Sequence, residues 1–276
     1  MKAKSLSVFF LLFCMVLITS CTSKAQEKPP DKSIFKDTMV EMTWEEVKKE
    51  AEKGSVVLFP IAVVEEHGPH MDLSPDIYET YHGCKLMKQS LEKKGISTVI
   101  APPYYWGINQ STGQFPGSFT VKPETFKAVL SDSIECLKRW GFTKVFCSNL
   151  HGDPVHRATL DSAINEIRTN LGIDVYNVDA LNVKVQNPPA FPSSWPGKYN
   201  PDYHAGADET SMMLSCYPDK VNTELAKKLK PQSAFEPLGY VGDPANFSKG
   251  KGGEILNVLS ERGALAIEAF LKQQKK

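Results

Sequence analysis

The chain has 276 residues, of which 41% are hydrophobic and 23% are charged, and its 32 basic residues balance its 32 acidic ones. This length accommodates one large domain with a substantial core. Because the sequence contains neither a basic block nor an RNA-binding motif, it indicates no nucleic-acid partner.

The first 20 residues have the features of a secretory signal. Lys2 and Lys4 precede an uncharged apolar run from Val8 to Ile18, which is too short for an ordinary transmembrane helix. Cys21 follows small residues in an arrangement that resembles the lipobox of bacterial lipoproteins. We therefore predict a signal peptide over residues 1–20 and an exported protein that a lipid on Cys21 anchors to the membrane, on its periplasmic or cell-surface side. The alternative is plain secretion.

A polar tether is predicted over residues 21–35, and one folded domain over residues 36–276. Hydrophobic patterning predicts strands at 55–64, 98–101, 144–147 and 174–178, and helices at 43–53, 77–94, 123–140, 155–171, 208–216 and 253–271. This alternation predicts an α/β domain with a mostly parallel sheet and helices on both sides. Two segments rich in Gly, Pro and aromatic residues, 102–121 and 187–203, are predicted to be long loops.

Side chains suited to metal binding follow two of these strands. The first strand leads into Glu65 and His67, with Asp76 before the next helix, and the third strand leads into His151 and Asp153. Ligands bind at the carboxyl ends of parallel strands, and residues two apart in an extended segment point the same way. Oxygen and nitrogen donors without thiolate predict a site for two divalent metals, either zinc, manganese or iron. The alternative for each histidine is a structural hydrogen bond.

A third polar cluster runs from His204 to Ser211. His204 and Glu209 are candidate proton carriers, because hydrolysis of an amide needs a base for water and an acid for the departing nitrogen. Their spacing by itself favours an ordinary helix start. We interpret His82 and His156, which fall inside predicted helices, as structural.

The cysteines of the folded domain are widely spaced and form no CxxC motif. Three of them lie in apolar segments, which favours buried small hydrophobic residues over a zinc ribbon. A disulfide is open in an oxidising compartment, but the spacing indicates no pair. These residues are Cys84, Cys136, Cys147 and Cys216.

Five segments together resemble one family. EEHGPHMDLSPD, from Glu65 to Asp76, resembles the E-x-H-G-P-H-x-x-L-x-x-D signature of the creatininase (creatinine amidohydrolase) family. The stretch from Pro102 that ends in FPGSFTV, then NLHGD, HAGADETSMML and GYVGDPANFSKGKGGE, resemble further segments in the family's order. The matches span almost the whole mature domain.

The resemblance also implies which residues hold metal. It implies that Glu65, Asp76 and His151 hold one ion. It implies that His67, Asp76 and Asp153 hold the other, so that Asp76 bridges the two. The position of Asp153 is a Glu in creatininase itself, so the carboxylate here has a shorter reach.

The family fold is a three-layer α/β/α domain, commonly assembled as a hexamer with sites near subunit contacts. By the same resemblance, His204 is the acid or base near the scissile C–N bond, and Glu209 is a catalytic or metal-proximal carboxylate. The common E-Q-H of the family is Glu65-Glu66-His67 here, which places an extra carboxylate beside the metal ligands.

These observations predict a metal-dependent hydrolase of a non-peptide C–N bond in a small molecule, with a cyclic amide as the expected substrate. The alternatives are a metallopeptidase-like activity on a short peptide and a ligand-binding lipoprotein that has lost the chemistry. Aromatic residues in the two loops are candidates to clamp a planar ring, or else to form lids and subunit contacts. They are Tyr104, Tyr105, Trp106, Trp195, Tyr199 and Tyr203.

Overall fold

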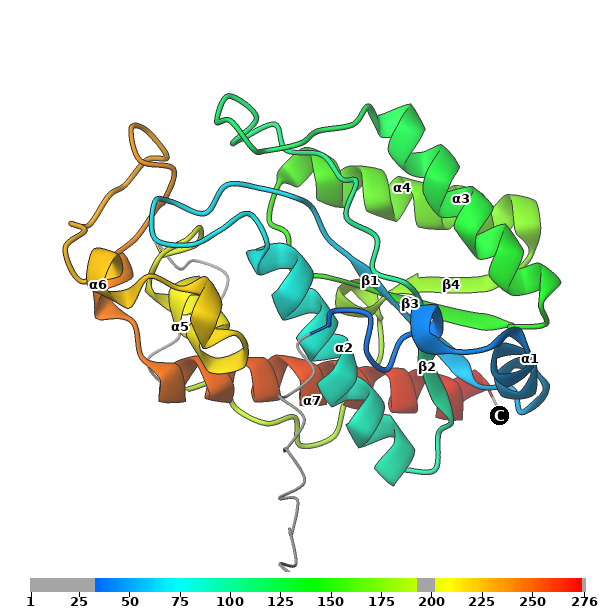
Figure 1. Ribbon diagram of the computed structural model, residues 1–276. Coiled ribbons are helices and arrows are strands. Elements are labelled where there is room, and N and C mark those ends of the chain that lie inside the picture. Colours follow the sequence, from blue (N-terminus) through cyan, green and yellow to red (C-terminus); the bar gives the residue numbers. More distant parts are fainter. Residues whose placement is uncertain (1–32, 193–201, 275–276) are drawn as a thin grey trace, which may run out of the picture. The chain divides into compact units, whose positions relative to one another are not determined.

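The computed structural model describes residues 33–192 and 202–274. Helices and strands alternate along the chain as far as the last strand. Figure 1 shows their arrangement. The strands are β1 (Val56–Ile61), β2 (Thr98–Ile100), β3 (Lys144–Asn149) and β4 (Asp174–Asn177). The helices are α1 (Trp44–Glu52), α2 (Pro75–Lys93), α3 (Pro123–Arg139), α4 (Pro154–Leu171), α5 (Ala207–Cys216), α6 (Thr223–Ala226) and α7 (Lys249–Gln274).

The four strands form one parallel sheet in the order β2-β1-β3-β4. The chain moves from β1 to one neighbour, β2, and then returns past β1 to β3 on its other side. The strand order therefore reverses between β1 and β3, which is where open α/β sheets bind ligands. Ile61 and Asn149 are partners at the carboxyl ends of these two strands. The segments that follow them consequently start side by side.

The sheet is covered on both faces, which confirms the predicted three-layer architecture (Figure 1). Val57, Phe59 and Ile61 of β1 pack toward α3 and α4 in one core cluster. Val56 and Leu58 of the same strand pack toward α2 and α7 in the other. Successive side chains of a strand point to opposite faces, so a strand buried on both sides must be apolar throughout.

Helix starts follow from local capping. Thr43 accepts a hydrogen bond from the Glu46 amide, and the Glu46 side chain accepts one from Thr43, so the predicted capping box is present at α1. Proline occupies the first turn of α2, α3 and α4, where its missing N–H costs nothing. The predicted helices are all found, and α7 extends beyond its expected limits at both ends.

The first strand is shorter than its apolar run predicts. Ala62 and Val63 remain buried and Val64 is partly buried, but these residues leave the sheet after Ile61 and are held by the loop that follows β2. The Ala62 amide donates to the Tyr104 carbonyl at 2.8 Å, and the Phe119 amide donates to the Val64 carbonyl at 3.0 Å. Loop 102–121 thus replaces a neighbouring strand and brings its residues to the end of β1.

Several predictions concern residues that the structure does not describe. The signal peptide, Cys21, most of the tether, Trp195 and Tyr199 lie outside the described residues. Among the helices of the described part, none is both long and apolar enough to cross a membrane. Cys84, Cys136, Cys147 and Cys216 are all free thiols.

Candidate metal centre

The polar side chains expected at the strand ends converge from four elements. Glu65 and His67 lie on the segment after β1, and His151 lies two residues after β3. Asp76 is in the first turn of α2, and Glu209 is in the first turn of α5. Helix starts and strand ends are both rigid points of a fold, so these side chains are held in fixed relative positions.

One group of possible ligands comprises Glu65, Asp76 and His151, all of them buried. His151 Nδ1 lies 3.1 Å from Glu65 Oε2 and 3.4 Å from Asp76 Oδ2. Thr112, on the loop after β2, donates its hydroxyl proton to the other oxygen of Glu65. One imidazole nitrogen and two carboxylate oxygens therefore face the same point.

A second group comprises His67, Asp76 and Glu209. His67 Nε2 lies 3.6 Å from Glu209 Oε2 and 4.0 Å from Asp76 Oδ2. Asp76 belongs to both groups, so its carboxylate stands between two potential cation positions. This is the arrangement that a bridging ligand of a two-metal site requires.

The hydrogen bonds of the two histidines fit metal ligation. His67 Nδ1 lies 3.2 Å from the Glu65 carbonyl oxygen, and His151 Nε2 lies 3.1 Å from that of Ile108. A metal-binding histidine commonly donates one ring N–H to a carbonyl, which leaves the other nitrogen for the ion. In the described structure His67 Nε2 and Asp76 Oδ2 are buried without a hydrogen-bond partner. The residues therefore fit a pair of divalent cations.

Electrostatics in the centre favour cations. Burial raises the pKa of Glu209 to about 7, with Asp76 adding to the effect and His204 opposing it. Burial and nearby His204 lower the pKa of His67 to about 3, so His67 is a neutral imidazole. Burial alone would lower the pKa of His151, but Asp76 and Glu65 raise it to about 11. Asp76 and Glu65 thus favour a positive charge at the position of the His151 ring nitrogen, where a divalent cation would take the place of the proton.

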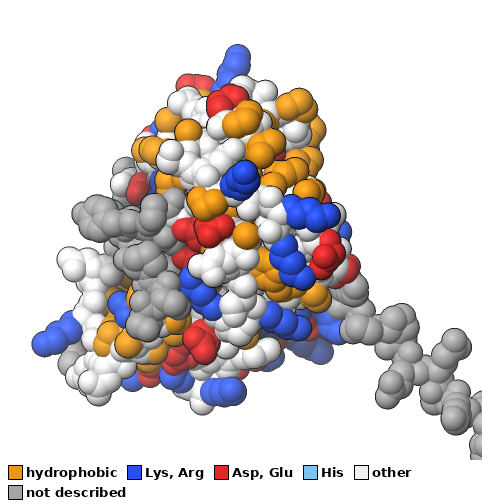
Figure 2. All heavy atoms as spheres, turned by 90° about the vertical axis from the view of Figure 1, so that its left-hand side faces the viewer, with side chains coloured by type: hydrophobic (Ala, Val, Ile, Leu, Met, Phe, Trp, Pro, Cys, Tyr) orange, Lys and Arg blue, Asp and Glu red, His pale blue; other side chains and the backbone are white. Residues whose placement is uncertain are grey.

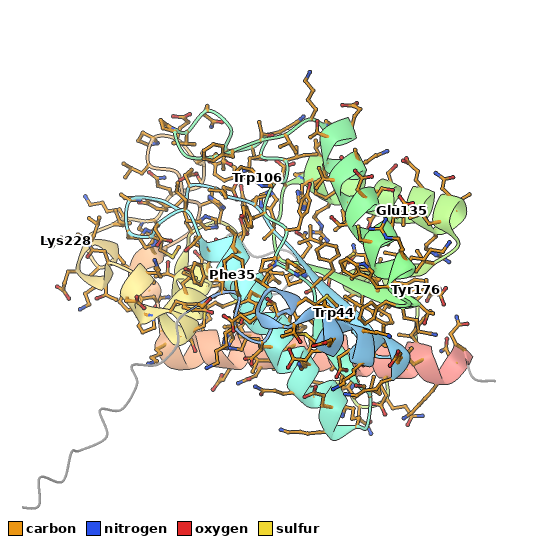
Figure 3. All side chains as sticks on the ribbon, turned by 45° about the vertical axis from the view of Figure 1, so that its right-hand side comes forward. Phe35, Trp44, Trp106, Glu135, Tyr176 and Lys228 are labelled. Atoms are coloured by element: carbon orange, nitrogen blue, oxygen red, sulfur yellow. The ribbon has the colours of Figure 1, made fainter. Side chains whose placement is uncertain are left out.

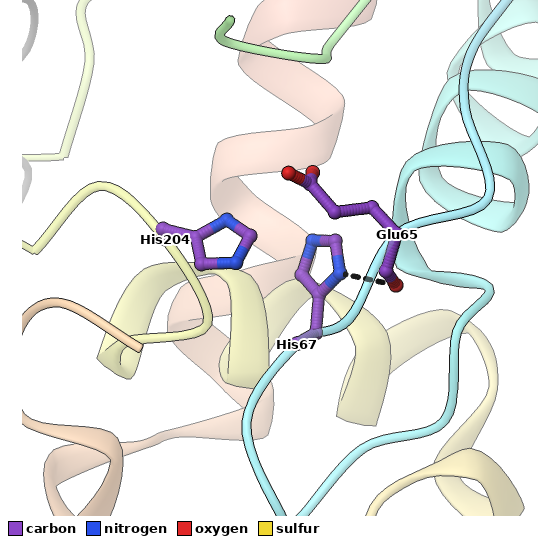
Figure 4. Close-up of side chains that lie close together, drawn as sticks. All are labelled: Glu65, His67 and His204. Atoms are coloured by element: carbon purple, nitrogen blue, oxygen red, sulfur yellow. Dashed lines mark hydrogen bonds between the residues drawn. The ribbon is translucent and has the colours of Figure 1, made fainter. Parts of the chain in front are cut away.

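His204 lies beside the second group of ligands. Its ring centroid is 4.5 Å from that of His67. Figure 4 shows the two imidazoles with Glu65, and these three buried residues form a further group of possible ligands. His204 Nε2 lies 3.0 Å from the Glu66 carbonyl oxygen and 3.3 Å from Glu66 Oε1. Burial opposes protonation of His204, but Glu66 and Glu209 raise its pKa to about 9. Glu66, whose role the sequence left open, therefore holds His204.

The structure brings together six of the seven predicted site residues, and Asp153 is the exception. Asp153 lies outside both ligand groups, because it is the N-cap of α4. One carboxylate oxygen accepts from the amides of Val155 and His156, and the other from both the amide and the hydroxyl of Ser111 and from the Gln110 amide. Glu209, which we expected to be a catalytic or metal-proximal carboxylate, lies with His67 and Asp76 in the second group.

Three residues of this region escaped the sequence interpretation. Thr112 contacts Glu65 and Glu79 lies near Glu209, partners that are distant along the chain and so give no local signal. Glu79 lies one helical turn beyond Asp76, and burial together with Glu209 and Asp76 raises its pKa well above the usual range. His70 was visible as the last residue of H-G-P-H, and its ring nitrogen lies 2.8 Å from Thr210 Oγ1.

The aromatic residues take different positions. Tyr104 is buried against Phe126 and belongs to the core, whereas Trp106 is 46% exposed on the loop after β2 (Figure 3). Tyr203 is 56% exposed and contacts Phe235, whose ring lies 5.2 Å from His204. An aromatic wall formed by Tyr203 and Phe235 therefore stands next to His204. On the face shown in Figure 2, acidic and basic side chains are interspersed among hydrophobic ones.

His70 gives a pH dependence to stability. Burial lowers the pKa of His70 to about 4, so the folded state keeps it neutral while the unfolded chain protonates it below pH 6.5. The free energy of unfolding therefore carries its full value above pH 6.5. It falls by up to about 3 kcal/mol as pH drops toward 4, because only the unfolded chain binds the extra proton. Urea unfolding at several pH values should show this loss, and the slope against pH should be shallower in His70→Asn. An unchanged slope would contradict the assignment.

The sheet, its two helical layers and the paired ligand groups define an α/β protein with a site for two divalent cations. A family model described as creatininase, creatinine amidohydrolase, matches residues 40–267. The chain belongs to the creatininase family. The predictions of this family and of an amidohydrolase are confirmed.

Two curated relatives match most of the chain. The creatinine amidohydrolase of Pseudomonas putida is 28% identical over 87% of this chain and 94% of its own. The mycofactocin precursor peptide peptidase of Mycolicibacterium smegmatis is 28% identical over 72% of this chain and 79% of its own.

Two solved structures share the fold. A manganese form of creatininase has a TM-score of 0.65 at 23% identity, over 84% of this chain and 97% of that one. A zinc–zinc form of a creatininase mutant has a TM-score of 0.64 at 24% identity, over 86% of this chain and 98% of that one.

Proposed function

We propose that this protein is a hydrolase that uses two divalent metal ions to open a C–N bond in a small molecule, with a cyclic amide as the substrate class. The observation that carries the proposal is the sharing of Asp76 by two ligand groups, in which every member is buried except the partly buried Glu209. Their donors are nitrogen and oxygen without thiolate, which suits zinc, manganese or iron. The manganese and zinc–zinc forms of creatininase support the same choice.

The protein supplies the ligands and the proton carrier. Glu65, Asp76 and His151 would hold one ion, and His67, Asp76 and Glu209 the other. When bound, such a pair polarises a carbonyl and activates water.

His204 provides the proton for the departing nitrogen. Glu66 fixes the ring by accepting from Nε2, so the opposite nitrogen, Nδ1, is the one left to act on the substrate. Figure 4 shows this imidazole next to His67, which is a ligand of the second group. Positioned acid–base groups of this kind contribute roughly 10²–10⁴-fold to rate.

His204→Ala tests the function and the role together. The variant should retain its metal and lose roughly 10²–10⁴-fold in kcat on a panel of cyclic amides. Elemental mass spectrometry and steady-state kinetics measure the two quantities. His82→Ala is the matched control, because His82 lies on α2 away from the ligand groups and contacts Tyr217. Full turnover by metal-loaded His204→Ala would sink the assigned role.

A peptide substrate is the second candidate, and the resemblance to a mycofactocin precursor peptide peptidase favours considering it. The two activities give different products. Cleavage of a short peptide releases a new α-amine, whereas opening of a cyclic amide yields a single linear product. Mass spectrometry of both reactions separates them. A protein with less than stoichiometric metal and no hydrolysis of either class would instead be a binding lipoprotein.

We also propose that the mature protein is an exported lipoprotein that assembles into a homo-oligomer. The apolar run before Cys21 and the small residues next to it support the anchor. Mass spectrometry of the mature N-terminus should show an acylated Cys21, and Cys21→Ser should move the protein from the membrane to the soluble fraction. Light scattering of Cys21→Ser measures the assembly, with six subunits expected. An unmodified mature N-terminus would contradict the anchor.

A further inference from the structure

The carboxylate of Asp202 joins two segments that are distant in sequence. Asp202 Oδ1 accepts a hydrogen bond from the Asp243 amide at 2.7 Å, and Asp202 Oδ2 accepts one from the Asp208 amide at 3.1 Å. Asp208 is in the first turn of α5, the helix that also carries Glu209. Asp243 belongs to the G-D-P segment near the C-terminus. The proposed reaction assigns no role to any residue of this segment.

Two glycines leave room for this carboxylate. A Cβ atom at Gly206 would lie 2.0 Å from Asp202 Oδ1, and one at Gly242 would lie 1.6 Å from the same atom. Real Cβ atoms essentially never approach another atom so closely, so any side chain at either position would displace the Asp202 carboxylate. The glycines of the HAG and GDP segments are thus both explained by the room that the partly buried Asp202 carboxylate needs.

His204 lies two residues before Gly206 and pairs with Val241, the residue before Gly242. Its carbonyl accepts from the Val241 amide at 2.7 Å, in an isolated antiparallel bridge between the two residues. The next residue, Ala205, has a φ of +50°, which a residue with a Cβ rarely adopts. The Ala205 amide donates to the Glu209 carboxylate. Such a strained turn persists only where its surroundings determine it, and Asp202 binds the segments on both sides of it.

We propose that Asp202 is a positioning residue that holds the turn carrying His204 in its reactive orientation, through its hydrogen bonds to the Asp208 and Asp243 amides. This inference rests on the proposed role of His204. Asp202 is a member of none of the groups of possible metal ligands, and these two hydrogen bonds reach the turn of His204 through the backbone.

The test compares Asp202→Asn and Asp202→Ala with the wild type, in the full-length chain loaded with zinc. Asp202→Asn keeps the shape and one acceptor oxygen, and it guards against a failure of Asp202→Ala to fold. Asn177→Ala is the matched control, because Asn177 likewise accepts from a backbone amide, that of Asp179, but on the outermost strand β4. Four quantities are measured: zinc content, amide exchange at Asp208 and Asp243, the imidazole resonances of His204, and kcat with KM.

We expect both Asp202 variants to keep their zinc and to exchange the two amides faster. The His204 imidazole resonances should shift or broaden, while those of His67 and His151 stay in place. The kcat should fall roughly 10- to 100-fold, as a small misplacement of a reacting group does, with less effect in Asp202→Asn. KM should stay within about twofold, since ground-state binding is not removed.

Unchanged His204 resonances in a folded, zinc-loaded Asp202→Ala variant would overturn the inference. Loss of zinc would overturn it too, because Asp202 would then support the ligands rather than the imidazole. An equal response in Asn177→Ala would show a general loss of stability. If the wild type binds zinc but hydrolyses nothing, the proposed function fails, whereas the resonances still decide whether Asp202 positions His204.

Discussion

Asp76→Ala should abolish metal binding at both positions of the centre, because Asp76 is the one residue that the two ligand groups share. The wild type should hold near two equivalents of zinc, manganese or iron by elemental mass spectrometry, and the variant well under one. Polarisation by metal contributes several kcal/mol to a hydrolytic transition state, so kcat/KM should fall on the order of 10³-fold or more.

Asp72→Ala is the matched control for this change. Asp72 precedes Asp76 on the same segment, but its carboxylate forms an Asx turn with Ser74 and pairs with Lys220 at 3.2 Å. The control should keep two equivalents and most of its activity. Two equivalents retained in Asp76→Ala would mean that the ligand groups do not share a bridging carboxylate, and the proposed centre would be wrong.

The parts of the site that could be predicted from sequence are those whose position follows from strand ends. The apolar run before Glu65 indicates a strand buried on both faces, and the strand before His151 is its parallel neighbour. Parallel neighbours end at the same edge of a sheet, so the convergence of Glu65 and His151 follows from topology. The position of Asp76 follows in the same way, because Asp76 is in the first turn of α2 and this helix returns across the face of β1.

The assignment of Asp153 shows where such reasoning stops. His151 and Asp153 are two apart, and we expected them to point the same way because that holds in an extended segment. Pro154 begins α4, however, and the side chain of the residue before a helix accepts hydrogen bonds from the first free amides of that helix. The sequence shows an Asp before a Pro at the predicted helix start. Helix capping therefore competed with metal binding as the role of the Asp153 carboxylate.

The contacts of Glu66 with His204 could not be predicted, because they join residues 138 positions apart. The same holds for Asp202, whose two backbone partners lie on α5 and on the G-D-P segment. Motif resemblance marked both segments as important without indicating that they touch. Long-range polar contacts of loops depend on how α5 and α7 pack, and local patterning carries no information on that packing.

Glu209→Gln should remove one of the two metal ions, while Asp153→Asn should remove neither. Glu209 offers an oxygen 3.6 Å from His67 Nε2, and loss of its charge leaves only His67 and the shared Asp76 in that group. The group of Glu65, Asp76 and His151 remains complete, so one equivalent should persist. Activity that needs both ions should fall on the order of 10³-fold.

Asp153→Asn should instead lower stability. Its carboxylate accepts from amides on both sides of the loop, and a neutral amide replaces one acceptor oxygen by a donor that faces other donors. We expect a cost of about 2 kcal/mol in urea unfolding, with two equivalents of metal retained. The reverse outcome, metal lost from Asp153→Asn but not from Glu209→Gln, would restore Asp153 as a ligand. It would also require the hydrogen bonds of at least one Asp153 oxygen, two at Oδ1 or three at Oδ2, to be disturbed when metal binds, which makes that outcome energetically the harder one to reach.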